Sequence, residues 1–302
     1  MGEGTTLKPK FSISCHFTEN SMILVKKTTH LAALLQTYRN PANSIGFVPT
    51  MGALHAGHLS LLAASKQANT ITIASIFVNP AQFNDKKDFE KYPVTIEKDI
   101  ELLAAAGCDA LFLPSVDEMY PQGWQQPQPY ELGYLETLLE GSYRPGHFQG
   151  VCRVMNRLMD LVGPGNLYMG QKDYQQCMVV SRLLTLLQSP AGLHTCPTLR
   201  EADGLAMSSR NTRLTASERK NATGIYNTLI FIKNAIQPGN TAALIKAGEA
   251  MLAENNFRVD YVTVADAQTL EPVLQWNGLQ PIVALIAAFQ NEVRLIDNML
   301  LN

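Results

Sequence analysis

The chain has 302 residues, 46% of them apolar and 17% charged, which excludes disorder as the main state and suffices for a full core and a second, smaller one. Its 24 basic and 26 acidic residues leave a formal charge of −2, which excludes a bulk surface for nucleic acid or an anionic membrane. The longest apolar stretch, residues 282–289, is far shorter than the ~20 residues of a membrane helix. We therefore expect a soluble protein that holds any phosphate locally.

The five cysteines are odd in number and widely spaced, at Cys15, Cys108, Cys152, Cys177 and Cys196. This spacing argues against a disulfide framework or a thiolate zinc site and indicates reduced, buried thiols in a cytoplasmic protein. Residues 1–21 differ in composition from the rest and lack the apolar centre and cleavage site of a secretory signal. We interpret them as a poorly ordered extension, with a weak organellar transit peptide as the alternative.

From residue 44 onward, short β-rich runs alternate with helical patterns, which predicts a parallel sheet with crossover helices. Strands are expected at 45–49, 70–78, 110–113 and 166–169. Helices are expected at 58–67, 95–106, 151–161 and 175–187. Gly107 suits the left-handed conformation that ends the second helix. The Gln- and Pro-rich stretch 121–129 predicts a surface excursion.

Beyond about Leu199 the pattern changes. Two helices, 217–235 and 241–255, are expected before three β-rich runs at 259–264, 282–289 and 293–296. Helices followed by consecutive strands predict a small α+β unit with an antiparallel sheet. The predicted fold class is therefore α/β, with a Rossmann-like parallel-sheet domain over residues 22–198 and a smaller C-terminal α+β lid domain over residues 199–302.

The segment PTMGALHAGH, residues 49–58, connects the strand expected at 45–49 to the helix expected at 58–67. Ligands of open α/β sheets bind at the carboxyl ends of strands, where a helix N-terminus offers free N–H groups to a phosphate. Gly52 and Gly57 permit close backbone approach, and His55 and His58 would lie on one side as donors to phosphate oxygens. Two ordinary histidines are the alternative, but the combination favours a phosphate site.

Two further segments carry groups suited to a nucleotide. In GQKD, residues 170–173, Lys172 can pair with a phosphate, and Asp173 either orients that lysine or caps the next helix. MSSR, residues 207–210, offers two hydroxyls and a guanidinium that could clamp a leaving diphosphate. A plain helix cap and a solvated loop are the respective alternatives.

Two glutamines are expected to overlook the same crevice. Gln82 follows the strand expected at 70–78, and Gln176 lies one turn into the helix after Lys172. Neutral amides can hold a carboxylate without a full positive charge, which would weaken that carboxylate as a nucleophile. The pair therefore predicts an acidic substrate beside the phosphate site. Cys152 and Cys177, close to these motifs in sequence, are interpreted as packing residues.

Together these segments resemble the pantothenate synthetase (pantoate–β-alanine ligase) family of the nucleotidyltransferase superfamily, which is marked by a His-x-Gly-His motif and a Lys-Met-Ser-Lys-Ser-like loop. The resemblance runs from about Met22 to the C-terminus. Its segments here are PTMGALHAGH (49–58), FVNPAQF (77–83), DFEKYP (88–93), YRPGHFQGV (143–151), KDYQQ (172–176) and READGLAMSSRN (200–211). PTMGALHAGH, RPGHFQGV and KDYQQ in combination are highly specific.

The resemblance implies an ATP-dependent condensation of (R)-pantoate with β-alanine to pantothenate. ATP would first activate pantoate as pantoyl adenylate with release of diphosphate, and β-alanine would then displace AMP, with Mg²⁺ required. A cytoplasmic homodimer is implied as well. The chemistry is consistent with such a site, because a carboxylate needs a leaving group before it can join an amine, and nucleotidyl transfer is catalysed mainly by positioning and charge.

The resemblance also implies roles for individual residues. The catalytic positions would be His58, His55, Lys172 and Arg210. The ATP contacts would be Met51, Gly52, Ala53, Leu54, His55, Ala56, Gly57, His58, Gly170, Gln171, Lys172, Asp173, the backbone at Leu199, Met207, Ser208, Ser209 and Arg210. Gln82 and Gln176 would hold pantoate, with Gln82 also near β-alanine, and Asp99 would lie near the metal. The chain departs from the family pattern at Val94, commonly Arg, and at Gln171, commonly Glu.

Two alternatives remain. A different superfamily member, such as a cytidylyltransferase or a fragment of an aminoacyl-tRNA synthetase, is disfavoured by the Gln82 and Gln176 pair and by the near-neutral charge. A nucleotide-sensing protein that has lost catalysis is disfavoured by intact His58, Lys172 and Arg210. Release of AMP would separate an enzyme from a sensor.

Overall fold

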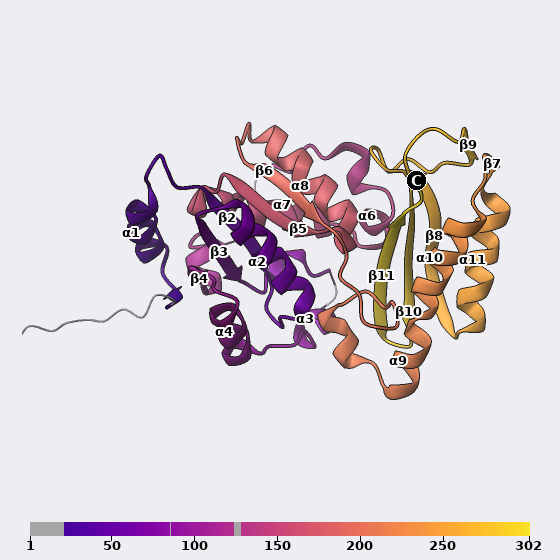
Figure 1. The fold of residues 1–302 in the computed structure, drawn as a ribbon, viewed down its shortest axis with the longest axis horizontal. Helices are drawn as coiled ribbons and strands as arrows, with labels where there is room; N and C mark the ends of the chain where they lie inside the picture. Colours follow the sequence, from indigo (N-terminus) through magenta and orange to yellow (C-terminus); the bar gives the residue numbers. More distant parts are fainter. Residues whose placement is uncertain (1–20, 85, 124–127) are drawn as a thin grey trace, which may run out of the picture.

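A six-stranded parallel sheet forms the larger part of the computed structural model, which describes residues 21–84, 86–123 and 128–302 (Figure 1). Its strand order is β1-β4-β3-β2-β5-β6. The strands are β1 (Ile23–Val25), β2 (Ile45–Thr50), β3 (Ile71–Ile76), β4 (Ala110–Phe112), β5 (Asn166–Gly170) and β6 (Gly192–Cys196). The chain runs outward from β2 to β3 and β4, and later returns to pair β5 with the other side of β2. The carboxyl ends of β2 and β5 therefore form the topological switch point where such sheets bind ligands.

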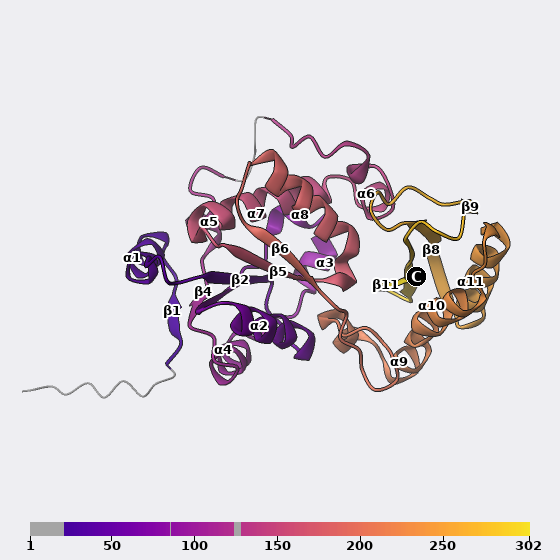
Figure 2. The same ribbon diagram turned by 45° about the horizontal axis from the view of Figure 1, so that its top comes forward.

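Alternate residues of the strands pack on opposite faces of this sheet. Phe47 and Leu167 join the core beneath one set of helices, whereas the next residues along the chain, Val48 and Tyr168, join the core beneath the other. The first face is covered by α1 (Thr28–Tyr38), α7 (His147–Val162) and α8 (Tyr174–Leu186). The second is covered by α2 (Ala56–Ala68) and α4 (Ile96–Ala105), as Figure 2 also shows. Burial on both faces explains the near-continuous apolar strands.

The C-terminal part is built on an antiparallel sheet of order β11-β10-β8. Its strands are β8 (Phe257–Asp266), β10 (Ile282–Gln290) and β11 (Val293–Leu300), and a small ladder pairs β7 (Gly239–Asn240) with β9 (Gln275–Trp276). The helices of this part are α9 (Ala216–Ala222), α10 (Gly224–Ala235) and α11 (Ala242–Glu254). Ala284 and Ile286 of β10 pack with α10, while Val283 and Leu285 join the core of the larger part. The sheet thus lies between its own helices and the larger part.

Short helical segments connect these elements. They are η1 (Pro80–Gln82), α3 (Lys86–Glu90), α5 (Val116–Met119), η2 (Gly133–Glu136), α6 (Glu140–Tyr143), η3 (Gln171–Asp173) and η4 (Ser209–Arg213). Glu140 of α6 accepts both guanidinium N–H groups of Arg294 on β11, at 2.7 and 2.8 Å, and Asp260 on β8 accepts from Arg294 Nε at 2.8 Å. This ion-pair network ties the parallel-sheet part to the C-terminal sheet.

The predicted fold class is confirmed: a parallel α/β sheet precedes an antiparallel C-terminal sheet. The structure corrects several elements. The helix expected over 217–235 is two helices, α9 and α10, separated at Thr223 just before Gly224, and the strand expected to reach residue 78 ends at Ile76 before Asn79-Pro80. The sequence patterns did not predict β1, α1 or β6.

Some sequence-based interpretations concern residues outside the described ranges. The extension at residues 1–21 lies outside the described residues except for Ser21, as do residues 124–127 of the expected surface excursion. The domain boundary between residues 198 and 199 stays a prediction. Within the described ranges, every helix is too short or too polar to span a lipid bilayer.

Candidate active site

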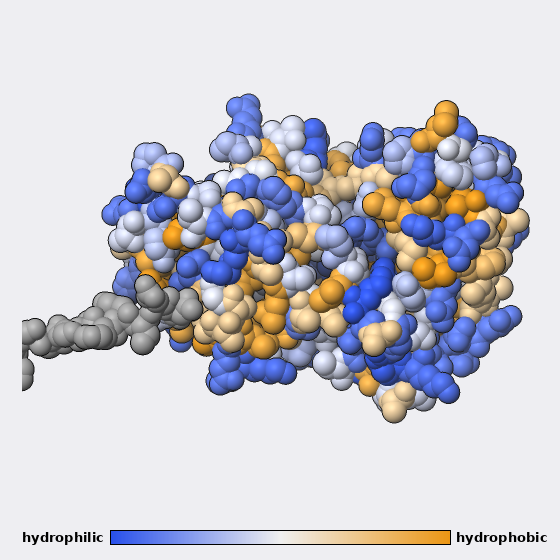
Figure 3. All heavy atoms as spheres, in the orientation of Figure 1, coloured by the Kyte–Doolittle hydropathy of each residue, from blue (hydrophilic) through white to orange (hydrophobic). Residues whose placement is uncertain are grey.

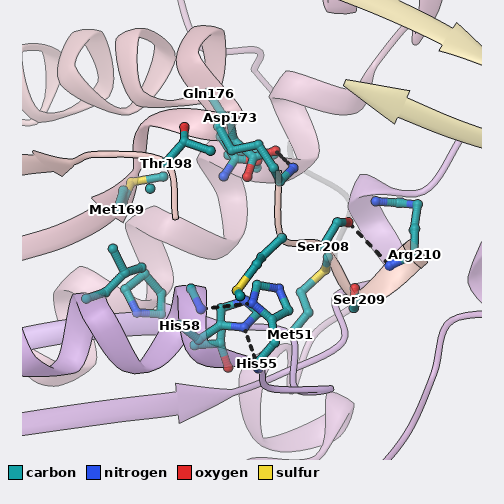
Figure 4. Close-up of a pocket in the computed structure, with 18 of the residues that line it drawn as sticks. Met51, His55, His58, Met169, Asp173, Gln176, Thr198, Ser208, Ser209 and Arg210 are labelled. Carbon is teal, nitrogen blue, oxygen red and sulfur yellow. Dashed lines mark hydrogen bonds and ion pairs between the residues drawn. The ribbon is translucent and has the colours of Figure 1, made fainter. Parts of the chain in front are cut away.

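A large cavity opens at the switch point, between the loop after β2 and the loop after β5. Its empty volume is about 1220 Å³, open solvent at its mouth included. Figure 4 shows His55 and His58 side by side on one wall, Asp173 and Gln176 on another, and the segment from Ser208 to Arg210 on a third. On the face drawn in Figure 3, strongly hydrophilic residues gather at the junction between the two parts of the molecule. Segments far apart in the sequence therefore meet around one cavity, which polar and apolar side chains line together.

The two histidines build the start of α2. His55 is the N-cap, its Nδ1 accepts from the backbone N–H of Gly57 at 3.2 Å, and His58 Nδ1 accepts from the backbone N–H of His55 at 3.4 Å. An imidazole whose Nδ1 accepts a hydrogen bond must, when neutral, carry its proton on Nε2. The hydrogen-bond network thus assigns both rings the same tautomer, with an Nε2–H donor on each.

Both imidazoles are held in the neutral form. Burial and the nearby Lys172 ammonium lower the pKa of His55 from 6.5 to about 4. Burial, followed by the neighbouring His55, lowers the pKa of His58 to about 3. The ring centroids lie 4.1 Å apart, so that a charge on one ring would oppose a charge on the other. Near neutral pH the pair consequently offers two fixed N–H donors at a helix N-terminus, and neither ring is an imidazolium cation.

We expect these pKa values to make the free energy of unfolding depend on pH. A folded-state pKa of about 3 for His58, against 6.5 in a model peptide, means that unfolding takes up a proton between those pH values. Stability therefore falls as pH drops below 6.5, by up to about 1.4 kcal/mol per pH unit for one such histidine. Urea unfolding of the wild type and His58→Asn should show a shallower slope in the variant between about pH 6 and 5. Equal slopes would contradict the assignment.

A buried carboxylate on α4 supports the loop that leads into the histidines. Asp99 is 0% exposed, its Oδ2 accepts from Ala53 N–H at 2.9 Å, and its Oδ1 accepts from Leu54 N–H at 2.8 Å. Gly52 and Ala53 have φ values of 80° and 49°, a left-handed conformation that costs energy at a non-glycine residue. The carboxylate compensates by satisfying both backbone donors.

These contacts bear on the metal role expected for Asp99. Its carboxylate also accepts from Thr95 Oγ1 at 3.0 Å, and it does not line the cavity. Among the described residues, no group of three or more His, Cys, Asp or Glu side chains is arranged to hold a metal ion. The metal role therefore stays a prediction that no contact of Asp99 supports, whereas its role in holding the loop follows from the geometry.

The opposite wall comes from the loop after β5 and the first turn of α8. Lys172 Nζ lies 3.2 Å from Asp173 Oδ1, and the lysine side chain is 18% exposed. Gln176 follows one turn later and lines the cavity on the same side (Figure 4). Lys172 thus presents a positive charge across the cavity from the two imidazole donors.

Gln82 is placed by close packing of two segments. It ends η1 and is 9% exposed, and its Oε1 accepts from Asn79 Nδ2 at 3.1 Å. Gly150 allows α7 to pack closely against η1, because a Cβ at this position would lie 2.1 Å from the carbonyl oxygen of Ala81. Asn79 Nδ2 also donates to the Gly150 carbonyl at 3.1 Å. The glutamine amide is therefore held rigidly at the floor of the site.

The segment expected to be a loop at residues 207–210 begins a short helix instead. Ser208 is the N-cap of η4, and its side chain accepts from the N–H of Arg210 at 3.3 Å. Arg210 Nη2 pairs with Asp88 Oδ2 at 2.7 Å, and Arg213 Nη1 pairs with Asp88 Oδ1 at 2.9 Å. Asp88 belongs to α3, so one carboxylate joins two arginines of η4 to the parallel-sheet part of the molecule.

A second cavity adjoins the first and shares Met51, Gln82, Lys172, Asp173, Gln176 and Arg210 with it. Arg144 and His147 line only this second cavity. His147 Nδ1 lies 2.7 Å from the Gln82 carbonyl oxygen, and burial together with Arg144 lowers the pKa of His147 to about 3. No role was predicted from the sequence for these residues or for Asp88, although all three lie in the runs RPGHFQG and DFEKYP.

The structure brings together most of the residues predicted for the site. The cavity is lined by Met51, His55, Gly57, His58, Gln82, Gly170, Lys172, Asp173, Gln176, Leu199, Met207, Ser208, Ser209 and Arg210. Gly52, Ala53, Leu54, Ala56, Gln171 and Asp99 do not line it, and among them Ala53, Leu54 and Asp99 form the supporting loop contacts. The Leu199 carbonyl accepts from Met207 N–H at 3.0 Å.

Fold and site together define a class of protein. A switch-point cavity with neutral histidine donors at a helix start, a lysine and an arginine-bearing segment is suited to an enzyme that moves a nucleotidyl group by positioning and charge. Within that class the chain belongs to the pantoate–β-alanine ligase family, whose sequence profile matches residues 23–300.

Individual relatives agree along nearly the whole chain. The pantothenate synthetase of Cytophaga hutchinsonii is 41% identical over 287 residues, which cover 93% of this chain and 99% of that protein. The crystal structure of pantothenate synthetase from Thermus thermophilus superposes with a TM-score of 0.84 at 43% identity, covering 92% of this chain and 99% of that one. The crystal structure of a Francisella tularensis pantoate–β-alanine ligase, complexed with β,γ ATP and β-alanine, has a TM-score of 0.78 at 34% identity, covering 93% and 98%.

Proposed function

We infer that this chain condenses (R)-pantoate with β-alanine at the expense of ATP, forming pantothenate, AMP and diphosphate through a pantoyl adenylate. Membership of the family carries this inference. The site supports it, because His55, His58, Lys172, Arg210, Gln82 and Gln176 all line the first of the two adjoining cavities. The Francisella complex, which contains a nucleotide and β-alanine, supports the same pair of substrates.

We place the triphosphate between the start of α2 and the loop after β5. The Nε2–H groups of His55 and His58 and the ammonium of Lys172 would surround it, and Arg210 would reach it from η4. Helix N–H groups and neutral imidazoles stabilise charge on phosphate oxygens without a proton transfer. Leu199 would meet the adenine, and Ser208 and Ser209 the phosphates.

Pantoate and β-alanine would occupy the floor and the second cavity. Gln82 and Gln176 line both cavities and offer amide N–H groups to pantoate. Arg144, which lines only the second cavity with a side chain 20% exposed, could pair with the carboxylate of β-alanine. The amine would then approach the activated carbonyl from the side opposite the nucleotide.

Two bond exchanges complete the reaction. A pantoate carboxylate oxygen attacks the α-phosphorus of ATP, and the bond to the bridging oxygen breaks as diphosphate leaves with the electron pair. The β-alanine nitrogen then attacks the acyl carbon, the carbon–oxygen bond to AMP breaks, and the nitrogen loses its proton. The side chains named above bind and orient the reactants, and no side-chain nucleophile is required.

Mg²⁺ fits this site as part of the nucleotide substrate. Asp173 is the carboxylate that lines the first cavity among the described residues, and one carboxylate is too few for a protein-built metal site. Mg²⁺ commonly uses substrate phosphates and water for most of its ligands. We therefore propose that the ion is bound as MgATP, where it neutralises phosphate charge.

Homodimerisation and a cytoplasmic location are further proposals, and both come from the family resemblance alone. Sedimentation of the purified chain would test the first. A mass of one chain at all concentrations would contradict it.

Substitutions on the wall formed by the loop after β5 and α8 should separate the two substrates. We expect Lys172→Ala to weaken the binding of ATP and Gln176→Ala to weaken the binding of pantoate, because an ammonium matches a phosphate and an amide matches a carboxylate and hydroxyls. Titration calorimetry of each variant with each ligand would measure this. A loss of about tenfold or more for the matched ligand is expected.

An equal loss of both ligands in both variants would contradict the assignment and point to collapse of the wall. Lys233→Ala is a matched control for the lysine, because Lys233 lies on α10, is bonded to the Leu300 carbonyl at 2.9 Å and lines neither cavity. It should bind both ligands as the wild type does.

A further inference from the structure

Strand β11 of the C-terminal sheet places a pair of polar residues, Asp297 and Asn298, in the wall of the second cavity, and Asn298 also contacts the loop that carries Lys172. β11 is one of the two edge strands of its sheet, and Asn298, 2% exposed, lies beside η3. We infer that Asn298 is a positioning residue that sets the direction of Lys172. This inference rests on the nucleotide role proposed for Lys172.

The amide of Asn298 is used entirely on one loop. Its Nδ2 donates to the backbone carbonyls of Gln171 and Lys172, both at 2.9 Å, and its Oδ1 accepts from Gln171 Nε2 at 3.2 Å. Both N–H donors and the acceptor of the side chain are therefore committed to η3. A buried amide with this many partners is expensive to leave unsatisfied, and so the contact is specific.

The two carbonyls lie on either side of the Lys172 α-carbon. The Gln171 oxygen belongs to the peptide plane before that carbon, and the Lys172 oxygen belongs to the plane after it. Because each peptide unit is planar, holding both oxygens fixes the two backbone dihedrals of Lys172 and hence the direction of its Cα–Cβ bond. A flexible lysine stem whose base is fixed explores less space, so the ammonium stays near the phosphates.

Asp297 extends the same support to the second nucleotide segment. Its carboxylate receives both Arg200 N–H groups, at 2.6 and 3.1 Å, and also accepts from Asn298 N–H at 2.8 Å. Arg200 follows Leu199, whose carbonyl accepts from Met207 N–H at 3.0 Å. Two neighbouring residues of β11 thus anchor the loop after β5 and the start of the segment that leads to Arg210.

A double-mutant cycle tests whether Asn298 acts through Lys172. Single-turnover adenylation and the KM for ATP and for pantoate are measured for wild type, Asn298→Ala, Lys172→Ala and the double variant. We expect Asn298→Ala to slow adenylation about tenfold in the wild-type background and by less than about twofold in the Lys172→Ala background. A purely structural role would lower the rate equally in both backgrounds.

Gln290→Ala is the matched control. Gln290 is also 2% exposed, lies on the same sheet, donates from Nε2 to the Asn255 carbonyl at 2.7 Å and lines neither cavity. It should lose stability without a change in the adenylation rate of the folded protein. If Asn298→Ala does not fold, Asn298→Asp keeps the side-chain volume but turns an acceptor toward the two carbonyls, and should show the same dependence on Lys172.

Three results would overturn the inference. They are an equal loss in both backgrounds, no loss in the wild-type background, and the same rate loss in Gln290→Ala. If Lys172→Ala itself leaves both adenylation and the KM for ATP unchanged, the nucleotide role of Lys172 fails first, and the inference fails with it. The single Lys172→Ala variant thereby distinguishes the two failures.

Discussion

His58→Ala should slow adenylate formation by about 10²–10³-fold while the chain still folds, the cost typical of removing one preorganised donor to a developing oxyanion. The reason is geometric: His58 Nδ1 accepts from the His55 N–H at 3.4 Å, so Nε2–H is the group left to face the nucleotide. The measurement is single-turnover release of diphosphate from ATP and pantoate.

A companion variant separates the donor from the helix cap. Loss of a capping side chain costs about 1 kcal/mol of stability, so His58→Ala could act partly through α2. His58→Asn keeps an acceptor for the His55 N–H but cannot reach the position of Nε2, and it should lose rate like alanine. His30→Ala, an exposed histidine on α1, should react at the wild-type rate. Near-normal single-turnover adenylation in folded His58→Ala would refute the role of this ring.

Arg210→Ala should slow adenylation by about 10²-fold and raise the AMP formed per pantothenate above one. Arg210 lines both cavities and is bound to Asp88 at 2.7 Å, which ties η4 to α3 across the site. We expect η4 to close over bound ATP and to open for release of diphosphate, whereas the C-terminal sheet, whose Val283 and Leu285 join the core of the larger part, stays docked. Closure would also keep water from the mixed anhydride, which otherwise hydrolyses before the amine arrives.

Hydrogen exchange over residues 204–213, with and without MgATP, checks this role directly. We expect protection to rise on binding in the wild type and to rise less in Arg210→Ala. Asp88→Asn, which keeps Arg210 but weakens its anchor, should give an intermediate loss of coupling. Arg219→Ala is the control, because Arg219 pairs with Asp203 at 2.7 Å and lines neither cavity. Unchanged protection together with one-to-one product coupling in Arg210→Ala would rule the closing role out.

The loop after β2 could be predicted because its chemistry is local. A strand, two glycines, two histidines and a helix start follow one another within PTMGALHAGH, and the structure assembles them in that order. The same holds for β10, whose apolar run is long, whereas β8 and β11 mix apolar and polar residues. Local sequence patterns predict such elements because the characteristic residue types all lie within one short stretch of the chain.

The missed elements β6 and α1 differ in how much pattern they carry. β6 reads Gly-Leu-His-Thr-Cys and is mostly exposed at the edge of the sheet, so it has no apolar run. In α1 a signal was present, because Leu31 and Leu35 are spaced for one helix face and both are buried. The residues between them, Ala32, Ala33 and Leu34, are apolar as well, so this helix could have been predicted from the sequence.

The missed site residues depend on distant partners. Asp88 meets Arg210, which is 122 positions away, and Asn298 meets Gln171, which is 127 positions away. Neither position has a local pattern that distinguishes it from a surface acid or a strand amide. The two parts of the molecule must be placed together before these contacts exist, which is why sequence patterns predicted the loops that line the cavity but not the residues that hold them.

The products formed when each substrate is left out in turn test the proposed reaction most directly. With MgATP, pantoate and β-alanine together, purified chain should form AMP, diphosphate and pantothenate in equal amounts. Without β-alanine, about one diphosphate per active site should appear, with no further turnover, because the adenylate stays bound. Steady AMP formation without pantoate, or release of ADP and phosphate in place of AMP and diphosphate, would contradict the proposed reaction.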